Sequence, residues 1–218
     1  AGYGPSTPSP PGRECGADWS EDYAHGTTVA LTAPADPDST FEGWTGACTG
    51  TSPTCTITVS ASVAVSATFT LRPRTLTVRR TGGGNGTVVS DPGGISCGSD
   101  CTEDYDHGAM VTLTARASMP DSRFAGWSGD CTGVGPRCTV TLTAAANVTA
   151  RFELVPRELR VTLAGTGAGT VTSDPAGVDC GATCDASFDH GTLVTLTAAE
   201  DSATSSFAGW SGACTGMS

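Results

Sequence analysis

The sequence predicts an all-β chain of small tandem repeat domains, stapled by disulfides and arranged as a rod. One ten-residue stretch occurs three times, as FEGWTGACTG, FAGWSGDCTG and FAGWSGACTG, and its tryptophans Trp44, Trp127 and Trp210 recur 83 residues apart. A fixed period of this length indicates tandem domains. Apolar residues alternate with polar ones as in half-buried strands, and no stretch has a helical period. Domains this small have modest cores, so the ten cysteines are expected to stabilise them covalently.

The repeat period divides the chain into an arm and three domains. Residues 1–12 are rich in proline, serine and glycine and are expected to form an extended arm. Repeat 1, residues 13–73, enters partway through the pattern and lacks the first strand. Repeat 2, residues 74–156, is complete. Repeat 3, residues 157–218, stops before its last hairpin.

The first half of repeat 2 is expected to contain one hairpin and one long loop. TLTVRR at 75–80 alternates as a strand, GGGNG at 82–86 supplies turn residues, and 87–90 returns as a second strand. The acidic segment 91–108 follows and is predicted to be a loop.

Four more strands complete repeat 2, and repeat 3 repeats the set until it ends. The later strands of repeat 2 are expected at 110–115, 123–127, 138–143 and 148–154. Those of repeat 3 are expected at 159–163, 169–173, 193–198 and 207–210.

Proline marks the connections between repeats. Pro73 and Pro156 each follow a sixth strand, and the next first strand begins within three residues. Such short connections predict restrained joints rather than freely moving beads.

The order of motifs between Leu76 and Phe152 resembles a known family. A Gly-rich turn, Y-x-H-G before VTLTA, F-x-GWSG-x-C-TG, CTVTLTA and VTARF follow one another as in the divergent internalin-B-type B-repeat, a bacterial repeat domain. The resemblance covers nearly the whole chain from Cys15 onward. It implies small β-rich, β-grasp-like modules of secreted or surface-anchored bacterial proteins, where they serve as stalks, spacers or adhesive segments. The cysteines and the long acidic segment depart from the commonest family pattern.

Cysteine spacing favours local disulfides. The motif C-TG-x4-C brackets a loop between two strands, which brings its cysteines within disulfide distance, and C-G-x-x-C forms the second kind of pair. Crossed pairings remain an alternative, as does a zinc site of four sulfurs, although Trp19 replaces a cysteine in repeat 1. The expected pairs are Cys48 with Cys55, Cys97 with Cys101, Cys131 with Cys138, and Cys180 with Cys184.

Local pairing leaves Cys15 and Cys214 without partners at opposite ends of the chain. A head-to-tail disulfide between Cys214 of one chain and Cys15 of the next would produce a polymer. The alternative is that the sequence is a window of a longer array, in which Cys214 finds a local partner. Incomplete terminal repeats are also expected to expose strand edges to sister chains.

The three repeated tryptophans are expected to be core anchors. Each is flanked by glycine and preceded by a phenylalanine three residues earlier, in domains with few other large apolar side chains. The alternative is a sugar-stacking platform formed by Trp44, Trp127 and Trp210.

The titratable residues do not predict catalysis. His25, His107 and His190 all precede a turn glycine, so turn residues are expected, with pH sensing beside Asp22, Asp104, Asp106 or Asp189 as the alternative. The acidic clusters Glu21-Asp22 and Asp100 to Asp106 could attract calcium, although they lack a full ligand set. No pair of unique carboxylates suggests glycoside hydrolysis.

Composition points to a secreted, non-enzymatic protein. The net charge of -11 argues against a nucleic-acid partner, and no stretch is long and apolar enough for membrane insertion. The first residues carry no signal peptide, so processing or excision is expected. The expected function is a stalk of a bacterial surface protein or a subunit of an extracellular fibre, with neighbouring repeats or identical chains as partners. The alternative is an adhesin module that binds carbohydrate or a host protein.

Overall fold

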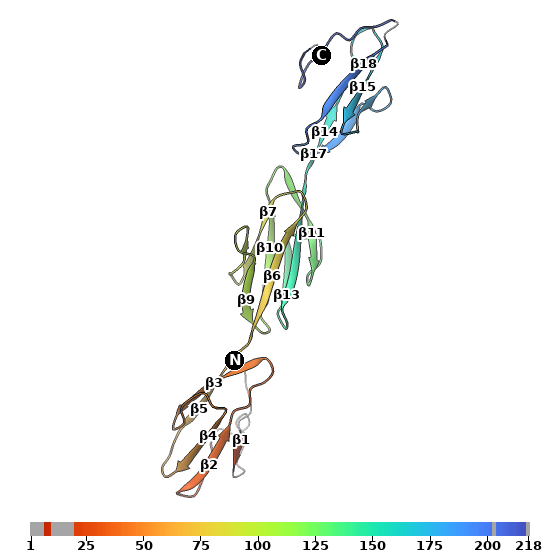
Figure 1. Cartoon of the computed structure of the whole chain (residues 1–218). Helices are drawn as coiled ribbons and strands as arrows, with labels where there is room; N and C mark the ends of the chain where they lie inside the picture. Colours follow the sequence, from red (N-terminus) through yellow and green to blue (C-terminus); the bar gives the residue numbers. More distant parts are fainter. Residues whose placement is uncertain (1–6, 10–19, 202–203, 217–218) are drawn as a thin grey trace.

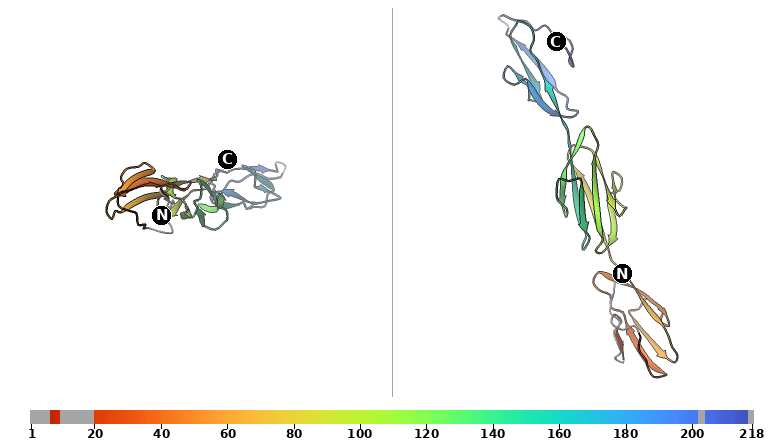
Figure 2. Two further views of the ribbon diagram at one scale, coloured as in Figure 1. Left: turned by 90° about the horizontal axis from the view of Figure 1, so that it is seen from below. Right: turned by 180° about the vertical axis from the view of Figure 1, so that it is seen from behind.

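The computed structural model describes residues 7–9, 20–201 and 204–216, and these contain strands, turns and loops but no helix. The predicted all-β class is therefore confirmed. Strands β1 to β5 form module 1, β6 to β13 form module 2, and β14 to β18 form module 3. Figures 1 and 2 draw the modules one after another in chain order.

Module 2 consists of two four-stranded sheets, with strand orders β11-β13-β6-β9 and β12-β10-β7-β8. β13 and β6 run parallel, from Ala146 opposite Leu76 to Arg151 opposite Thr81, and the other pairs are antiparallel. The strands are β6 (Pro73–Thr81), β7 (Gly86–Asp91), β8 (Ser96–Cys97), β9 (Thr102–Asp106), β10 (Met110–Ala117), β11 (Ser122–Gly129), β12 (Arg137–Thr141) and β13 (Ala146–Leu154).

The core of module 2 lies between these sheets. Alternation in β6 buries Leu76 and Val78, and alternation in β10 buries Val111 and Leu113 on the facing sheet. Phe152 from β13 fills the space with only 1% of its surface exposed. Burial of these side chains from water is the main stabilising contribution to the module.

The expected hairpin between 75–80 and 87–90 is wrong. β6 pairs with β13 and β9, so both of its edges are occupied, and β7 pairs with β10 and β8 in the other sheet. The turn at 82–86 therefore carries the chain across the core. Its glycines allow a close approach, because a Cβ on Gly82 would collide with the carbonyl oxygen of Phe152.

The expected final hairpin is wrong for a similar reason. β12 pairs with β10, whereas β13 pairs with β11 and β6. Between them Leu142 is fully buried, and its N–H donates to the carbonyl of Ala109 at 2.9 Å. The connection therefore crosses from one sheet to the other instead of reversing along one sheet.

The acidic segment 91–108 is not only a loop, because it contains β8 and β9. β9 lies along the edge of β6 and points Tyr105 inward, where its hydroxyl donates to Ser90 Oγ at 2.8 Å. The alternating residues Asp104 and Asp106 are exposed. The charges of this strand disguised its alternation in the sequence.

Module 1 contains one sheet of order β1-β2-β4 and the pair β3-β5. Part of the expected arm is a strand, since β1 pairs antiparallel with β2. The strands are β1 (Thr7–Ser9), β2 (Thr27–Thr32), β3 (Ser39–Gly46), β4 (Thr54–Val59) and β5 (Val65–Leu71).

Module 3 contains the pair β14-β17 and a sheet of order β16-β15-β18. The strand expected at 207–210 is wrong, since only Trp210 forms an isolated bridge, to Gly216. The matching strands β3 and β11 form by pairing with β5 and β13, and the described part of module 3 offers 207–210 no such partner. The strands are β14 (Pro156–Arg160), β15 (Gly169–Asp174), β16 (Asp179–Cys180), β17 (Asp185–Asp189) and β18 (Thr195–Glu200).

Candidate functional site

In the repeated tryptophan motif, the tryptophan is hydrogen-bonded to the loop that follows it. In module 2 the N–H of Trp127 donates to the carbonyl of Gly133 at 2.7 Å, and its indole Nε1 donates to the carbonyl of Gly135 at 2.9 Å. Gly126 has a φ of +145°, and a Cβ there would lie 2.9 Å from the Gly133 oxygen. The glycine before the tryptophan is thus required by the close approach of the following loop.

The motif points its tryptophans into the modules. Trp44 is 5% exposed and Trp127 is 6% exposed, whereas Trp210 is half-buried. Trp127 packs against Phe124 with 5.1 Å between ring centroids, and the other two copies have the same tryptophan–phenylalanine pair. Trp44 and Trp127 therefore do not offer an open ring face for a sugar.

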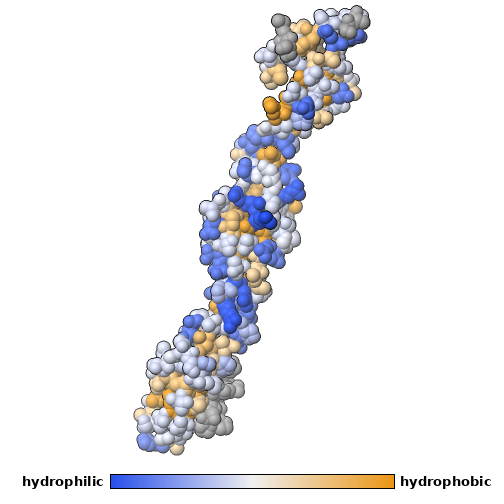
Figure 3. Space-filling view, in the orientation of Figure 1, coloured by the Kyte–Doolittle hydropathy of each residue, from blue (hydrophilic) through white to orange (hydrophobic). Residues whose placement is uncertain are grey.

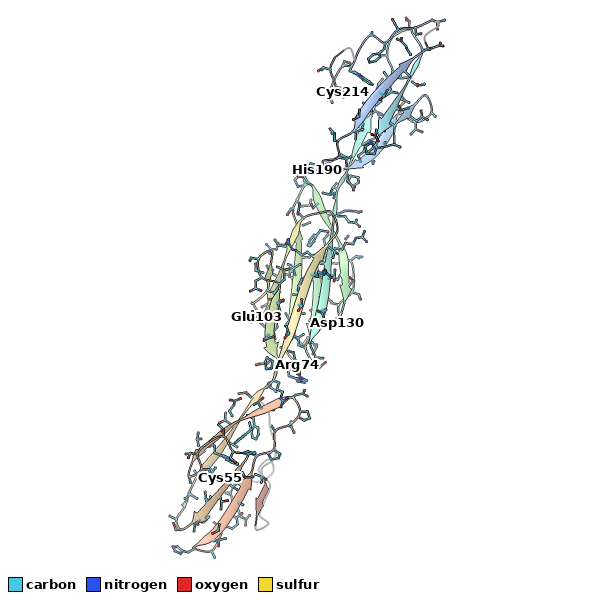
Figure 4. The ribbon with its side chains drawn as sticks, in the orientation of Figure 1. Cys55, Arg74, Glu103, Asp130, His190 and Cys214 are labelled. Atoms are coloured by element: carbon cyan, nitrogen blue, oxygen red, sulfur yellow. A yellow bond between two sulfur atoms is a disulfide. The ribbon has the colours of Figure 1, made fainter. Side chains whose placement is uncertain are left out.

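Each of the four disulfides in the described residues joins cysteines close in sequence. Cα atoms are 6.2 Å apart in Cys48–Cys55 and Cys131–Cys138, and 4.3 Å apart in Cys97–Cys101 and Cys180–Cys184. In module 2 both disulfides close connections that pass between the sheets, from β11 to β12 and from β8 to β9. They restrain the crossings that define the fold. Figure 4 labels Cys55 of the module 1 pair.

The two remaining cysteines differ in what can be described. Cys214 is exposed and forms no disulfide within the described residues (Figure 4). Cys15 lies outside the described residues, as does Trp19.

The acidic residues in the described part of the chain do not converge into a cation site. Among the described residues no group of three or more His, Cys, Asp or Glu side chains could hold a metal ion. Asp104 accepts a hydrogen bond from Thr75 at 2.6 Å, and Asp130 accepts one from the N–H of Asn147 at 2.6 Å. These carboxylates act locally on separate strands and turns.

Arg160 of β14 pairs with Asp185 of β17, and this contact raises its pKa. The hydrogen bond from its Nε to Asp185 at 2.9 Å, the charge of Asp185, and the charge of Glu158 raise the pKa of Arg160 above its ordinary value. The side chain of Arg160 is 73% exposed, so this pair lies on the surface of module 3.

Two of the three histidines, His107 and His190, lie where modules meet, whereas His25 is an exposed turn residue of module 1. His107 precedes Gly108, whose φ is +81°, and His190 precedes Gly191 at +84°, so both occupy turns. Their Nδ1 atoms contact carboxylates of the preceding module, His107 with Asp38 at 3.4 Å and His190 with Asp121 at 3.3 Å. The acids named from the sequence, Asp104, Asp106 and Asp189, are not these partners. Sequence reasoning missed the contacts because they join different repeats.

No helix in the described part of the chain is long and apolar enough to cross a membrane.

Comparison with known proteins identifies the repeats. The family model of the divergent InlB B-repeat domain matches three consecutive segments, residues 13–73, 75–156 and 159–218. No curated protein and no solved structure matches the chain. The three matches together cover most of the sequence. The chain therefore belongs to the divergent InlB B-repeat domain family, as a tandem array of three repeats.

Proposed function

We propose that the chain is a non-enzymatic spacer, a stalk segment of a bacterial surface protein that holds other parts of that protein away from the cell. The observation that carries this proposal is the length of the connections. Only Arg72 lies between β5 and β6, and only Val155 lies between β13 and β14. One residue gives a module little room to fold back on its neighbour.

The disulfides, the net charge and the hydrophilic surface support an extracellular role. Four local disulfides are typical of proteins from oxidising compartments. The net charge of -11 favours solubility and repulsion between chains. On the face drawn in Figure 3, hydrophilic residues are prominent over module 2 and beside its two joints. Family membership supports a place at the bacterial surface.

Module deletion tests the spacer function. Removal of residues 74–156 connects Pro73 to Arg157 and keeps the repeat in phase. We expect the maximum dimension from small-angle scattering to fall by about 30–40 Å, since a nine-residue strand such as β13 spans about 30 Å. Duplication of the same segment should lengthen the chain by the same amount.

Two results would contradict the spacer function. One is a maximum dimension that does not change with the number of modules. The other is saturable binding of the purified chain to a polysaccharide or host matrix protein, which would support the adhesin alternative. The burial of Trp44 and Trp127 disfavours that alternative for sugars.

A fibre subunit is the second candidate, because Cys214 is an exposed cysteine without a disulfide partner in the described residues. A disulfide between Cys214 and Cys15 of a neighbouring chain predicts a ladder of oligomers in non-reducing electrophoresis that collapses on reduction. Cys214→Ser should remove the ladder and leave the monomer folded. A ladder that persists in reductant, or a native chain that runs only as monomer, would eliminate this linkage.

A further inference from the structure

The connection between modules 1 and 2 carries a compact set of polar contacts, which we call the first joint. The N–H of Arg72 donates to the carbonyl of Asp38 in module 1 at 2.8 Å, and its carbonyl accepts from the N–H of His107 in module 2 at 3.1 Å. The Asp38 carboxylate accepts from Arg74 at 2.5 Å and contacts His107 Nδ1 at 3.4 Å. Figure 4 labels Arg74 at this connection.

The second joint, between modules 2 and 3, repeats this arrangement. The N–H of Val155 donates to the carbonyl of Asp121 at 2.9 Å, and its carbonyl accepts from the N–H of His190 at 3.3 Å. The Asp121 carboxylate accepts from Arg157 at 3.1 Å and contacts His190 Nδ1 at 3.3 Å. Arg157 also donates to the carbonyl of Pro120 at 3.1 Å. His190 is labelled at this joint in Figure 4.

The two joints use matching positions of the repeat. Asp38 and Asp121 lie 83 residues apart, as do Arg74 and Arg157, and both histidines precede the turn glycine after the acidic strand. Each contact set joins the turn before β3 or β11 in one module to the first strand and the histidine turn of the next. The same two backbone hydrogen bonds and the same two side-chain contacts occur at both joints, which indicates one interface geometry used twice.

The first joint is partly shielded from water. The side chains of Arg74 and His107 are 24% and 23% exposed, and Arg74 Nε and His107 Nδ1 are buried atoms without a hydrogen bond. The Asp38 carboxylate beside them carries the charge opposite to that of Arg74. The second joint is more open, with Arg157 at 50% and His190 at 44%.

We propose that the Asp–Arg–His cluster is a docking site through which each module recognises the module that follows it and fixes its orientation. The aspartate carboxylate of one module accepts a hydrogen bond from the arginine of the next repeat and contacts Nδ1 of that repeat's histidine. Exposed ion pairs by themselves stabilise a structure only weakly. Here the one-residue connection has already brought the partners together, so the contacts need only select one orientation.

The proposal also identifies a repeat that lacks the acceptor. Thr204 occupies the position of Asp38 and Asp121 in module 3 and has no carboxylate. The cluster therefore specifies the first and second joints, and the matching surface of module 3 does not form it. This inference concerns orientation and holds whether or not the array is a spacer.

Residual dipolar couplings of the full 218-residue chain test the docking site. In the native chain, the couplings of neighbouring modules should fit one alignment tensor. Asp38→Ala should separate the tensors of modules 1 and 2 and leave modules 2 and 3 coupled. Asp121→Ala should do the reverse. The control Asp185→Ala removes the partner of Arg160 inside module 3 and should separate neither pair.

The outcomes are distinct. If the couplings measured within a module still fit the structure of that module, its fold is intact. A difference between the alignment tensors of two modules then cannot arise from unfolding. If both aspartate variants keep the native common tensor, or if native modules already align independently, the docking site is overturned. Length that is additive in the deletion series together with independent tensors would retain the spacer and reject the docking site.

Discussion

Trp127→Ala is expected to destabilise module 2 by about 3–5 kcal/mol, the cost of removing a large aromatic side chain from a core. Trp127 is 6% exposed and packs against Phe124 with 5.1 Å between centroids. Its truncation leaves a cavity and also leaves the carbonyl of Gly135 without the indole donor. Because β11 carries this residue, the sheet that contains β13 and β6 loses part of its support.

Chemical denaturation monitored by circular dichroism measures the change in the free energy of unfolding. NMR signals assigned to each module show whether module 2 is the one that unfolds earlier. Val134→Ala, in the following loop, is the control because Val134 is 84% exposed and its truncation leaves no core cavity. Trp127→Phe should give an intermediate loss, since it keeps an aromatic ring and removes the indole hydrogen bond. Equal stability of Trp127→Ala and Val134→Ala would show that the motif is not a core anchor.

Gly82→Ala is expected to destabilise module 2 by at least about 2 kcal/mol, since an L-residue in the left-handed region costs about 1–2 kcal/mol before any steric conflict is added. Gly82 has a φ of +92°, and a Cβ there would collide with the carbonyl oxygen of Phe152. That oxygen also accepts a hydrogen bond from the N–H of Gly84 at 3.1 Å. The turn cannot move away without loosening its contact with β13.

Thermal unfolding of the variant against Gly93→Ala checks this prediction. A Cβ on Gly93 would meet no atom within 4 Å beyond the adjacent residues, and the φ of Gly93 is not positive, so alanine should be tolerated there. An unfolding temperature of Gly82→Ala equal to that of the native chain would contradict the prediction. It would show that the turn at 82–86 can rearrange to accept a Cβ.

The sequence predicted the positions of most strands with an apolar alternation, and it did not predict which strands pair. The alternation of Leu76 with Val78, and of Val111 with Leu113, marks residues that face a core. A period of two says nothing about which edge of a strand bonds to which neighbour. The Gly82–Gly86 turn looked like a hairpin because its composition suits one, yet both edges of β6 are taken by strands distant in sequence.

The acidic strand β9 had a weak signal that could have been used. Tyr105 is the one aromatic residue in TEDYD, and an aromatic ring among charged neighbours in a chain with three tyrosines is a candidate for burial. The parallel pairing of β13 with β6 had no such local sign.

A comparison of the polar residues that recur in the repeats could have predicted the contacts at the joints. Asp38 and Asp121, like Arg74 and Arg157, keep the 83-residue spacing although they lie outside the cores. Recurring polar residues next to short connections indicate an interface. The partners of each cluster lie more than 30 residues apart in sequence, so no local pattern could pair them.

The parallel pairing of β6 with β13 determines how module 2 responds when its ends are pulled apart. Tension enters at Pro73 through module 1 and leaves at Leu154 through module 3, so the two strands are drawn in opposite directions along their length. The six residue pairs from Ala146 opposite Leu76 to Arg151 opposite Thr81 are then loaded together in shear. Their hydrogen bonds do not break one pair at a time. A tether that must withstand flow would profit from terminal strands arranged in this way.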